Sequence, residues 1–244
     1  MKQRLRPCFL ILWMLPMCFY SSDSKAQTIE DPNIISYVVN LKKQTLKFFH
    51  KNDLGTNFGN FQSLRETLEA SNQKLRFAMN GGMYLNDGTP QGLYIENGEI
   101  LKDLDTTKEA YGNFYLQPNG IFYFTKYDEG VVCKTSEFEL TPDILYATQS
   151  GPMLVINSKI HSAFVKGSKN LHIRNGVGIL PNGHLLFAMS KDLINLYDFV
   201  EYFQKHGCNN ALYLDGYVSR MFLPEKNWEQ LDGQFGVIIA EIEQ

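Results

Sequence analysis

Three Asn-Gly pairs, each set between short apolar or alternating runs, constrain the fold of this chain more than any other feature. Asn-Gly readily adopts two consecutive positive φ angles, which a two-residue turn between antiparallel strands requires. The pairs are Asn97-Gly98, Asn119-Gly120 and Asn182-Gly183. The sequence therefore predicts three strand-turn-strand units, at residues 92–101, 114–124 and 176–190.

Further apolar runs of strand length lie outside these units. Residues 34–39 and 46–50 are predicted to form an opening pair of strands, and residues 144–148, 153–156 and 235–240 are further candidates. Apolar residues at helical spacing predict two helices. The first carries Phe61, Leu64 and Leu68. The second carries Leu193, Leu196, Val200 and Phe203, with Asp192 as the predicted N-cap and Gly207 at its end.

Each predicted helix is followed by a short apolar strand that ends in a polar residue and glycine. Residues 75–79 lead into Asn80-Gly81-Gly82, and residues 211–214 lead into Asp215-Gly216. Both strands thus present a short polar side chain at their C-terminal end. Glycine beside that side chain allows a ligand or another backbone to approach closely.

Strands outnumber helices and connect mainly as hairpins. This pattern predicts an α+β fold with a largely antiparallel or mixed sheet core and a few packed helices. The length after the N-terminal segment, residues 27–244, fits a single domain.

The first 26 residues have the layout of a secretory signal peptide. Lys2, Arg4 and Arg6 precede an apolar run at residues 8–20, and Ala26 ends a short polar stretch suited to cleavage. We therefore expect an exported protein, periplasmic or extracellular. An uncleaved membrane anchor is an alternative. A lipid anchor at Cys18 is another, although Met17 is large for the position before a lipidated cysteine.

Charge argues against a nucleic-acid partner. Removal of residues 1–26 takes away four basic residues and one acidic residue, which changes the formal net charge from −3 to −6. Proteins that bind phosphate backbones use clustered Lys and Arg, and the sequence contains no such cluster. No segment after residue 26 is apolar enough to predict a transmembrane span. Cys133 and Cys208 either pair or stay as two buried free thiols, and the sequence slightly favours the second.

Four polar clusters fall at predicted strand ends or turns and are candidates for a site. They are residues 80–84 (N-G-G-M-Y), 149–152 (Q-S-G-P), 172–175 (H-I-R-N) and 215–220 (D-G-Y-V-S-R). Each cluster alone is equally well explained as a turn or a solvated strand face.

In chain order, however, N-G-G-M-Y, N-D-G-T-P-Q-G-L, S-G-P-M-L, R-N-G-V-G-I and L-D-G-Y-V-S resemble the phosphodiester glycosidase family, from about residue 77 to residue 239. This is the family of the "uncovering enzyme" of lysosomal targeting, which removes N-acetylglucosamine from a sugar phosphodiester. The resemblance implies a glycosidase that acts on sugar phosphodiesters. Many relatives have a run of glycines after the aspartate, whereas Tyr217 and Val218 stand here, as in a divergent bacterial branch. The sugar therefore stays open.

The chemistry of the clusters is consistent with that implication. Glycoside hydrolysis usually uses two carboxyl groups, but the clusters offer one strong candidate, Asp215, with Asp87, Glu96 and Asp192 in reserve. A phosphate monoester, whose second pKa is about 6, leaves as an anion without a general acid. A guanidinium such as that of Arg174 can hold it with two parallel hydrogen bonds.

We assign provisional roles on this basis. Asp215 is the nucleophile or the base on water, Arg174 holds the phosphate, and Asn80 and Ser219 bind the sugar or orient Asp215. Backbone amides at Gly81-Gly82 and Ser150-Gly151 add donors to the phosphate. His172 reaches the site beside Arg174, on the opposite strand face from Ile173.

Other classes fit less well. Ser150 and Ser219 lack the G-x-S-x-G turn of a serine hydrolase, and the histidines lack the spacing of a zinc site. No cofactor is expected, although residues 86–88 leave structural calcium open. The main alternative is a non-catalytic protein on the same fold that binds glycans or assists polysaccharide assembly.

Overall fold

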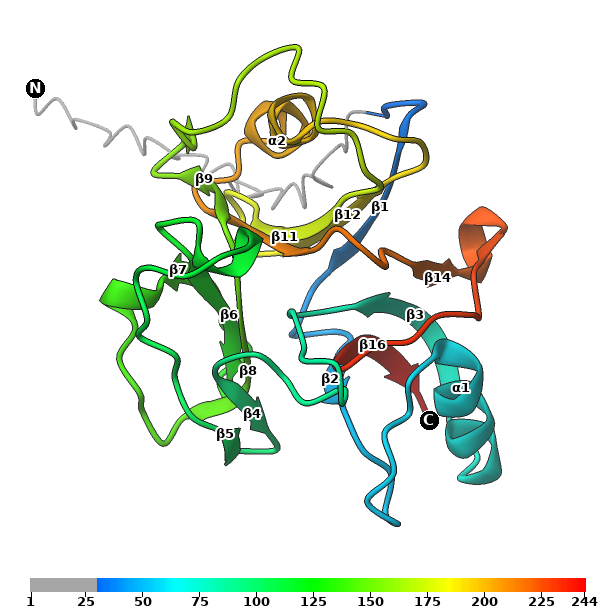
Figure 1. Cartoon of the computed structure of the whole chain (residues 1–244). Helices are drawn as coiled ribbons and strands as arrows, with labels where there is room; N and C mark the ends of the chain where they lie inside the picture. Colours follow the sequence, from blue (N-terminus) through cyan, green and yellow to red (C-terminus); the bar gives the residue numbers. More distant parts are fainter. Residues whose placement is uncertain (1–29) are drawn as a thin grey trace, which may run out of the picture.

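The strands form three antiparallel sheets in the structure, a computed structural model that describes residues 30–244 (Figure 1). The predicted signal peptide, residues 1–26, lies outside the described residues. Sheet I contains β1 (Ile34–Val39), β9 (Met153–Ile156), β10 (Lys159–Ile160), β11 (Asn175–Ile179), β12 (Leu185–Ser190) and β13 (Ala211–Asp215). Its spatial order is β1-β12-β11-β13-β9-β10.

The other two sheets have five strands each. Sheet II contains β2 (Thr45–Phe49), β3 (Lys74–Asn80), β14 (Met221–Leu223), β15 (Trp228–Glu229) and β16 (Ile238–Glu243), in the order β15-β14-β3-β16-β2. Sheet III contains β4 (Tyr94–Glu96), β5 (Glu99–Lys102), β6 (Gly120–Thr125), β7 (Gly130–Lys134) and β8 (Ile144–Ser150), in the order β5-β4-β8-β6-β7. The prediction of a largely antiparallel, β-rich fold is confirmed.

One central apolar core is shared by all three sheets. Sheet I contributes Phe187, sheet II contributes Phe77 and sheet III contributes Phe122. The Phe187 ring lies between the other two, with its centroid 5.2 Å from that of Phe77 and 5.8 Å from that of Phe122. Strand alternation explains how sheet I also has a second apolar face: Phe187 points into this core, whereas Leu186 points to the opposite side.

The two helices cover outer sheet faces (Figure 1). Helix α1 (Phe61–Ala70) buries the predicted stripe of Phe61, Leu64 and Leu68 against sheet II. Helix α2 (Leu196–Lys205) packs on sheet I. Each helix runs into the strand that carries a candidate polar residue, α1 into β3 and α2 into β13, so both predicted helix-strand units are confirmed. Short 3-10 turns lie at Asn113–Tyr115, Thr135–Glu137 and Pro224–Lys226.

Two of the three predicted hairpins form. Asn97 and Gly98 have φ angles of 51° and 81° and join β4 to β5, and Gly183 has a φ of 81° between β11 and β12. The unit at 114–124 is wrong. Residues 114–119 form no strand, and the φ of Gly120 is not positive. Glycine stands there because a Cβ would lie 2.7 Å from the Cys133 carbonyl oxygen.

Three smaller predictions are also corrected. The strands at 34–39 and 46–50 do not pair, because β1 joins β12 in sheet I and β2 joins β16 in sheet II. The cap of α2 is Asn195 rather than Asp192, since Asn195 Oδ1 accepts from the Asp198 amide at 3.0 Å. The last strand is β16, which begins at Ile238 rather than at residue 235.

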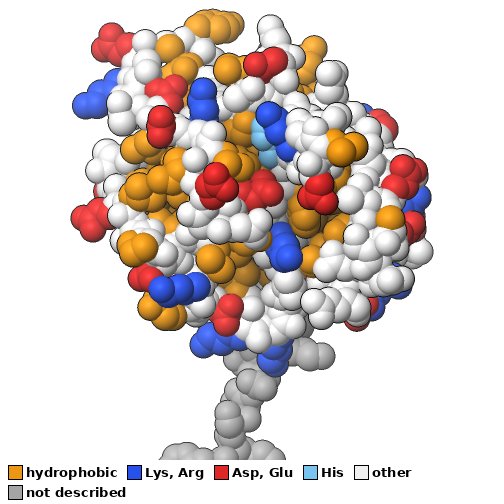
Figure 2. All heavy atoms as spheres, turned by 90° about the horizontal axis from the view of Figure 1, so that it is seen from below, with side chains coloured by type: hydrophobic (Ala, Val, Ile, Leu, Met, Phe, Trp, Pro, Cys, Tyr) orange, Lys and Arg blue, Asp and Glu red, His pale blue; other side chains and the backbone are white. Residues whose placement is uncertain are grey.

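Cys133 and Cys208 are free thiols; Cys208 is buried as predicted, whereas Cys133 is half-buried. Burial raises the pKa of Cys133 to about 11 and that of Cys208 to about 12, which keeps both protonated near neutral pH. Charged side chains of both signs are interspersed with apolar ones on the face drawn in Figure 2. Neither helix in residues 30–244 has the length and apolar character needed to cross a bilayer.

The packing of α1 gives a test of this core. Leu64→Ala, at a fully buried position, should lower the free energy of unfolding by about 2–5 kcal/mol through lost burial and an unfilled cavity. Leu54→Ala, at a position 89% exposed, is the matched control and should change it by less than about 0.5 kcal/mol. Equal values in urea denaturation would contradict the described packing of α1 on sheet II.

Candidate active site

The C-terminal ends of three strands, one from each sheet, meet in one region. Asn80 ends β3 of sheet II, Ser150 ends β8 of sheet III and Asp215 ends β13 of sheet I. All three side chains are buried, with exposed fractions of 1%, 0% and 6%. Polar groups that are buried at the junction of separate sheets need hydrogen-bond partners, and these partners define the site.

Asn175, the first residue of β11, joins two of these strand ends. Its Nδ2 donates to the Asn80 carbonyl at 2.9 Å and to Asn80 Oδ1 at 3.1 Å. Its Oδ1 accepts from the Asp215 backbone amide at 2.8 Å. One fully buried amide therefore holds Asn80 and Asp215 in fixed relative positions. Asn175 belongs to the predicted cluster at residues 172–175, but its role cannot be predicted from sequence, because only tertiary structure shows what it bridges.

A β-bulge in β13 provides the third link. Asn175 pairs with Asp215 and Gly176 pairs with Tyr213, so Leu214 is an extra residue on that strand. The Leu214 carbonyl is left to accept a hydrogen bond from Ser150 Oγ at 2.7 Å. Bulges of this kind occur beside active sites, where they redirect the side chains that follow. Ser150 thus anchors sheet III to the strand that carries Asp215.

Asp215 itself is a buried carboxyl group held by the loop that follows it. Its Oδ1 accepts from the Tyr217 amide at 2.9 Å. Burial raises the pKa of Asp215 to about 6, and hydrogen bonds from the backbone amides of residues 216–218 only partly offset that effect. Among residues 30–244 no second carboxyl group shares a hydrogen bond with Asp215. Perturbed carboxyl groups of this kind cluster at functional sites.

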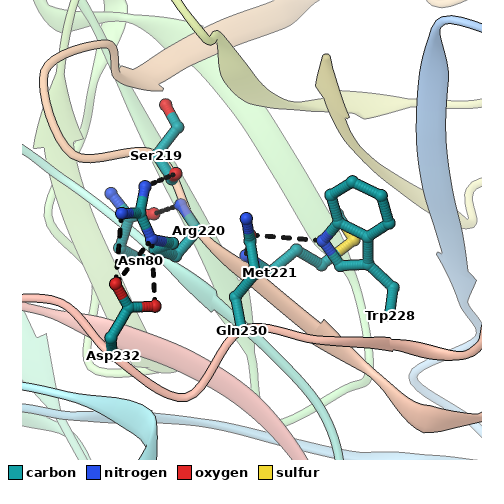
Figure 3. Close-up of polar contacts among 7 residues, drawn as sticks. All are labelled: Asn80, Ser219, Arg220, Met221, Trp228, Gln230 and Asp232. Atoms are coloured by element: carbon teal, nitrogen blue, oxygen red, sulfur yellow. Dashed lines mark hydrogen bonds and ion pairs between the residues drawn. The ribbon is translucent and has the colours of Figure 1, made fainter. Parts of the chain in front are cut away.

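Ser219 and Asn80 support this loop from either side. Ser219 Oγ donates to the Asp215 carbonyl at 2.6 Å and lies 3.2 Å from the Ile173 carbonyl. Asn80 Oδ1 also accepts from the Arg220 amide at 2.8 Å, a bond drawn in Figure 3. Asn80 Nδ2 is buried without a hydrogen-bond partner. An unpaired buried donor is costly, so it offers a position for an acceptor on a bound ligand.

Arg174 lies beneath the same loop but is largely committed to the protein. Its Nη1 donates to the Tyr213 hydroxyl at 2.7 Å, its Nη2 to Asn170 Oδ1 at 2.8 Å and to the Asn170 carbonyl at 3.0 Å, and its Nε to the Ile194 carbonyl at 3.3 Å. The side chain is 1% exposed. The guanidinium therefore fixes the segment around β11. It has no pair of adjacent N–H groups left to bond two phosphate oxygens.

Gly216 explains how these groups pack so closely. A Cβ at Gly216 would lie 1.4 Å from the Tyr213 hydroxyl and 3.2 Å from Arg174 Nη1. The loop backbone can rest on the tyrosine hydroxyl and the guanidinium only because glycine stands there.

The remaining predicted residues have mainly structural contacts. The Gly81 amide donates to the Val237 carbonyl at 3.0 Å, and Gly82, with a φ of 74°, leaves room for Thr148 of sheet III. Gly151, which follows Ser150, packs against Asn119. The peptide bond between Gly151 and Pro152 is cis. His172 is exposed and forms a backbone bridge with Ile194, whose carbonyl also accepts from Arg174 Nε.

Tyr84 is a neighbour of Asp215, and the sequence predicts no role for it. The negative charge of Asp215, after burial, helps to raise the pKa of Tyr84 to about 12. The Tyr84 hydroxyl also donates to the Gln234 carbonyl. Asn80 is the last residue of β3, and Tyr84 lies in the loop that follows. Tyr84 thus connects this loop to the segment 231–236 before β16.

Residues 30–244 contain no group of three or more His, Cys, Asp or Glu side chains arranged to hold a metal ion. A cavity of about 610 Å³ is lined by Ser36, Lys191, Tyr202 and Trp228 among others, and not by Asn80, Ser150 or Asp215. It contains none of the predicted site residues. We place the site at Asp215 because the buried carboxyl group and the unpaired amide are there, whereas cavity size alone specifies no chemistry.

Residues 73–235 match the family model for phosphodiester glycosidases. The chain belongs to the phosphodiester glycosidase family. The matched range begins one residue before β3 and includes Asn80, Ser150, Asn175, Asp215 and Ser219, so every strand end of the junction lies within it.

Individual proteins resemble the chain over most of its length. The chain is 34% identical to the uncharacterized protein YigE of Escherichia coli K12 over 220 residues, which cover 90% of this chain and 85% of the relative. Among solved structures it resembles the zebrafish N-acetylglucosamine-1-phosphodiester alpha-N-acetylglucosaminidase catalytic domain auto-inhibited by its pro-peptide. That match has a TM-score of 0.58 and 13% identity, and it covers 88% of this chain and 85% of that one. A putative exported protein from Burkholderia pseudomallei matches with a TM-score of 0.55 and 10% identity, covering 85% and 73%.

The bridge made by Asn175 gives one prediction. Asn175→Ala should lower the free energy of unfolding by about 2–4 kcal/mol, because it leaves buried groups of Asn80 and Asp215 without partners. Asn113→Ala, at an exposed asparagine, should shift it by less than about 0.5 kcal/mol. Thermal unfolding of both variants checks this, and a change of similar size in the two would refute the bridge.

The buried carboxyl group gives a second prediction. A carboxyl group whose pKa is higher in the folded state stabilises the protein below its unfolded pKa, and this contribution is lost as pH rises through the folded pKa. Between about pH 3.5 and 7.5 the wild type should therefore lose up to about 3 kcal/mol of stability relative to Asp215→Asn. Denaturant unfolding of both proteins across that range measures the difference. A difference that does not change with pH would show that Asp215 is not desolvated.

Proposed function

We propose that this protein is an exported hydrolase that releases a sugar from a sugar-1-phosphodiester, in the cell envelope or outside the cell. The observation that carries the proposal is a single buried carboxyl group, Asp215, at the strand junction of a chain in the phosphodiester glycosidase family. The layout of residues 1–26 supports export to the periplasm or the exterior, whether free or anchored by lipid.

The chemistry needs few groups when the leaving group is a phosphate monoester. The bond between sugar C1 and the phosphate oxygen breaks, and the electron pair leaves on an oxygen that is stable as an anion. Water supplies the hydroxyl that ends on C1. Asp215 either takes the proton from that water or first bonds to C1 and is then displaced by water. Both routes require ionised Asp215, and a pKa of about 6 makes it mostly ionised at neutral pH.

The surroundings of Asp215 suit a sugar ring. Tyr217 follows in the loop with its side chain 92% exposed, and its backbone amide is fixed on the Asp215 carboxylate. An exposed aromatic ring two residues after the carboxylate, in the same loop, can provide a platform on which a sugar stacks. Asn80 Nδ2, buried without a partner, is available for a sugar hydroxyl or a phosphate oxygen.

The exposed ring of Tyr217 also favours a second candidate, a protein that binds glycans without cleaving them. Such a protein would keep the aromatic platform and the strand junction. It would have no need for an ionised Asp215, so activity and binding must be measured separately.

The test is release of sugar from a panel of sugar-1-phosphodiesters and nitrophenyl glycosides. Turnover of the phosphodiesters should rise with pH through about 6 and fall by about 10²–10⁴-fold in Asp215→Asn. Asp53→Asn, which changes an exposed carboxyl group outside the candidate clusters, is the matched control and should retain full activity.

Other results have definite meanings. Cleavage of nitrophenyl glycosides would indicate a second carboxyl group that acts as a general acid. Sugar binding without any turnover would favour the glycan-binding candidate, and full turnover in Asp215→Asn would eliminate the assigned role.

A further inference from the structure

A phosphodiester substrate needs a cation at the site, and Arg174 has no open fork to provide one. Arg220 is the cation that the loop after Asp215 brings to the junction. Its backbone amide donates to Asn80 Oδ1, and it directly follows Ser219, which holds the Asp215 carbonyl. Its backbone is therefore fixed by the same residues that fix the carboxyl group.

The side chain of Arg220, unlike that of Arg174, reaches solvent. It is 34% exposed, and its guanidinium faces the carboxylate of Asp232, which is 69% exposed (Figure 3). Nε lies 3.2 and 3.4 Å from the two Asp232 oxygens, Nη2 lies 3.2 Å from one of them, and Nη1 donates to the Ser219 carbonyl at 3.1 Å. Strong charge-assisted bonds are shorter, at about 2.7–2.9 Å, and exposed ion pairs contribute little to stability.

Asp232 belongs to the segment 231–236, which also contacts Tyr84. The Gln234 carbonyl of this segment accepts from the Tyr84 hydroxyl, and Tyr84 lies within the field of the Asp215 carboxylate. Phe235 anchors the segment by packing on Phe61 of α1, with ring centroids 4.8 Å apart. The segment 231–236 therefore contacts Arg220 through Asp232 and Tyr84 through Gln234, and Tyr84 is a neighbour of Asp215.

We propose that Arg220 recognises the phosphate of the substrate, and that Asp232 holds its guanidinium in place until phosphate oxygens replace the carboxylate. This inference rests on the proposed function. Nε and Nη2 form the edge that matches two phosphate oxygens, and this edge is the one that Asp232 occupies. Arg220 is a specificity-determining residue in this scheme, because it distinguishes a phosphodiester from an uncharged glycoside.

Binding of N-acetylglucosamine 1-phosphate, measured by calorimetry, tests the inference without turnover. Arg220→Gln should weaken binding at least tenfold, and Arg220→Lys should recover part of it, since lysine restores charge without the fork. Asp232→Asn should tighten binding several-fold, because it removes the competing carboxylate. Binding of uncharged N-acetylglucosamine should be unchanged in all three variants.

The ion pair between Arg76 and Glu243 provides matched controls. Arg76 is paired with exposed Glu243, which lies opposite Lys74 at the other end of β3 from Asn80, so Arg76→Gln and Glu243→Gln remove the same kinds of charge away from the site. Both variants should bind N-acetylglucosamine 1-phosphate as the wild type does. Kinetics with phosphodiesters should show the Arg220→Gln effect mainly in KM.

Each remaining outcome overturns a defined part. If the wild type binds the sugar phosphate and Arg220→Gln binds it equally well, Arg220 is not the phosphate site, although the proposed function stands. If Asp232→Asn weakens binding, Asp232 orients the arginine and does not compete with phosphate. If the wild type neither binds the sugar phosphate nor cleaves any phosphodiester, the proposed function fails and this inference fails with it.

Discussion

The side-chain amide of Asn175 is the interaction on which the arrangement of the site depends. Three sheets share one core, but a shared core does not set the positions of strand ends to within a hydrogen bond. Asn175 does so for sheets I and II, and Ser150 extends the connection to sheet III through the Leu214 carbonyl. Because both side chains are fully buried, neither can exchange its partner for water at low cost.

The same junction works against stability in one respect. Asp215 is held where it is poorly solvated, and backbone amides compensate its charge only in part. An aspartate with ordinary solvation would stabilise the folded chain better at neutral pH, but it would also be a weaker base. Local polar strain of this kind is common at functional sites, where the rest of the fold supplies the stability.

The sequence predicted local structure where local chemistry decides it. The turn at Asn97-Gly98 and the stripe of α1 follow from φ preference and helical spacing, and the polar residues that end β3 and β13 were recognised as site candidates. It failed where distant packing decides. Gly120 is glycine because of the Cys133 carbonyl, β1 and β2 separate into different sheets, and four of the five N–H groups of Arg174 bond to partners that its neighbours in sequence do not reveal. Asn175 and Arg220 stood in quoted motifs, but their importance lies in contacts across sheets.

The loop after Asp215 combines a residue that cannot change with one that can. Gly216 is locked against the Tyr213 hydroxyl, so any side chain there would displace the whole loop. Tyr217 is open to solvent and contributes only its backbone amide to the carboxylate, which every residue except proline can supply. Ligand preference can therefore diverge at position 217 through single substitutions, while the carboxyl group beside it keeps its geometry.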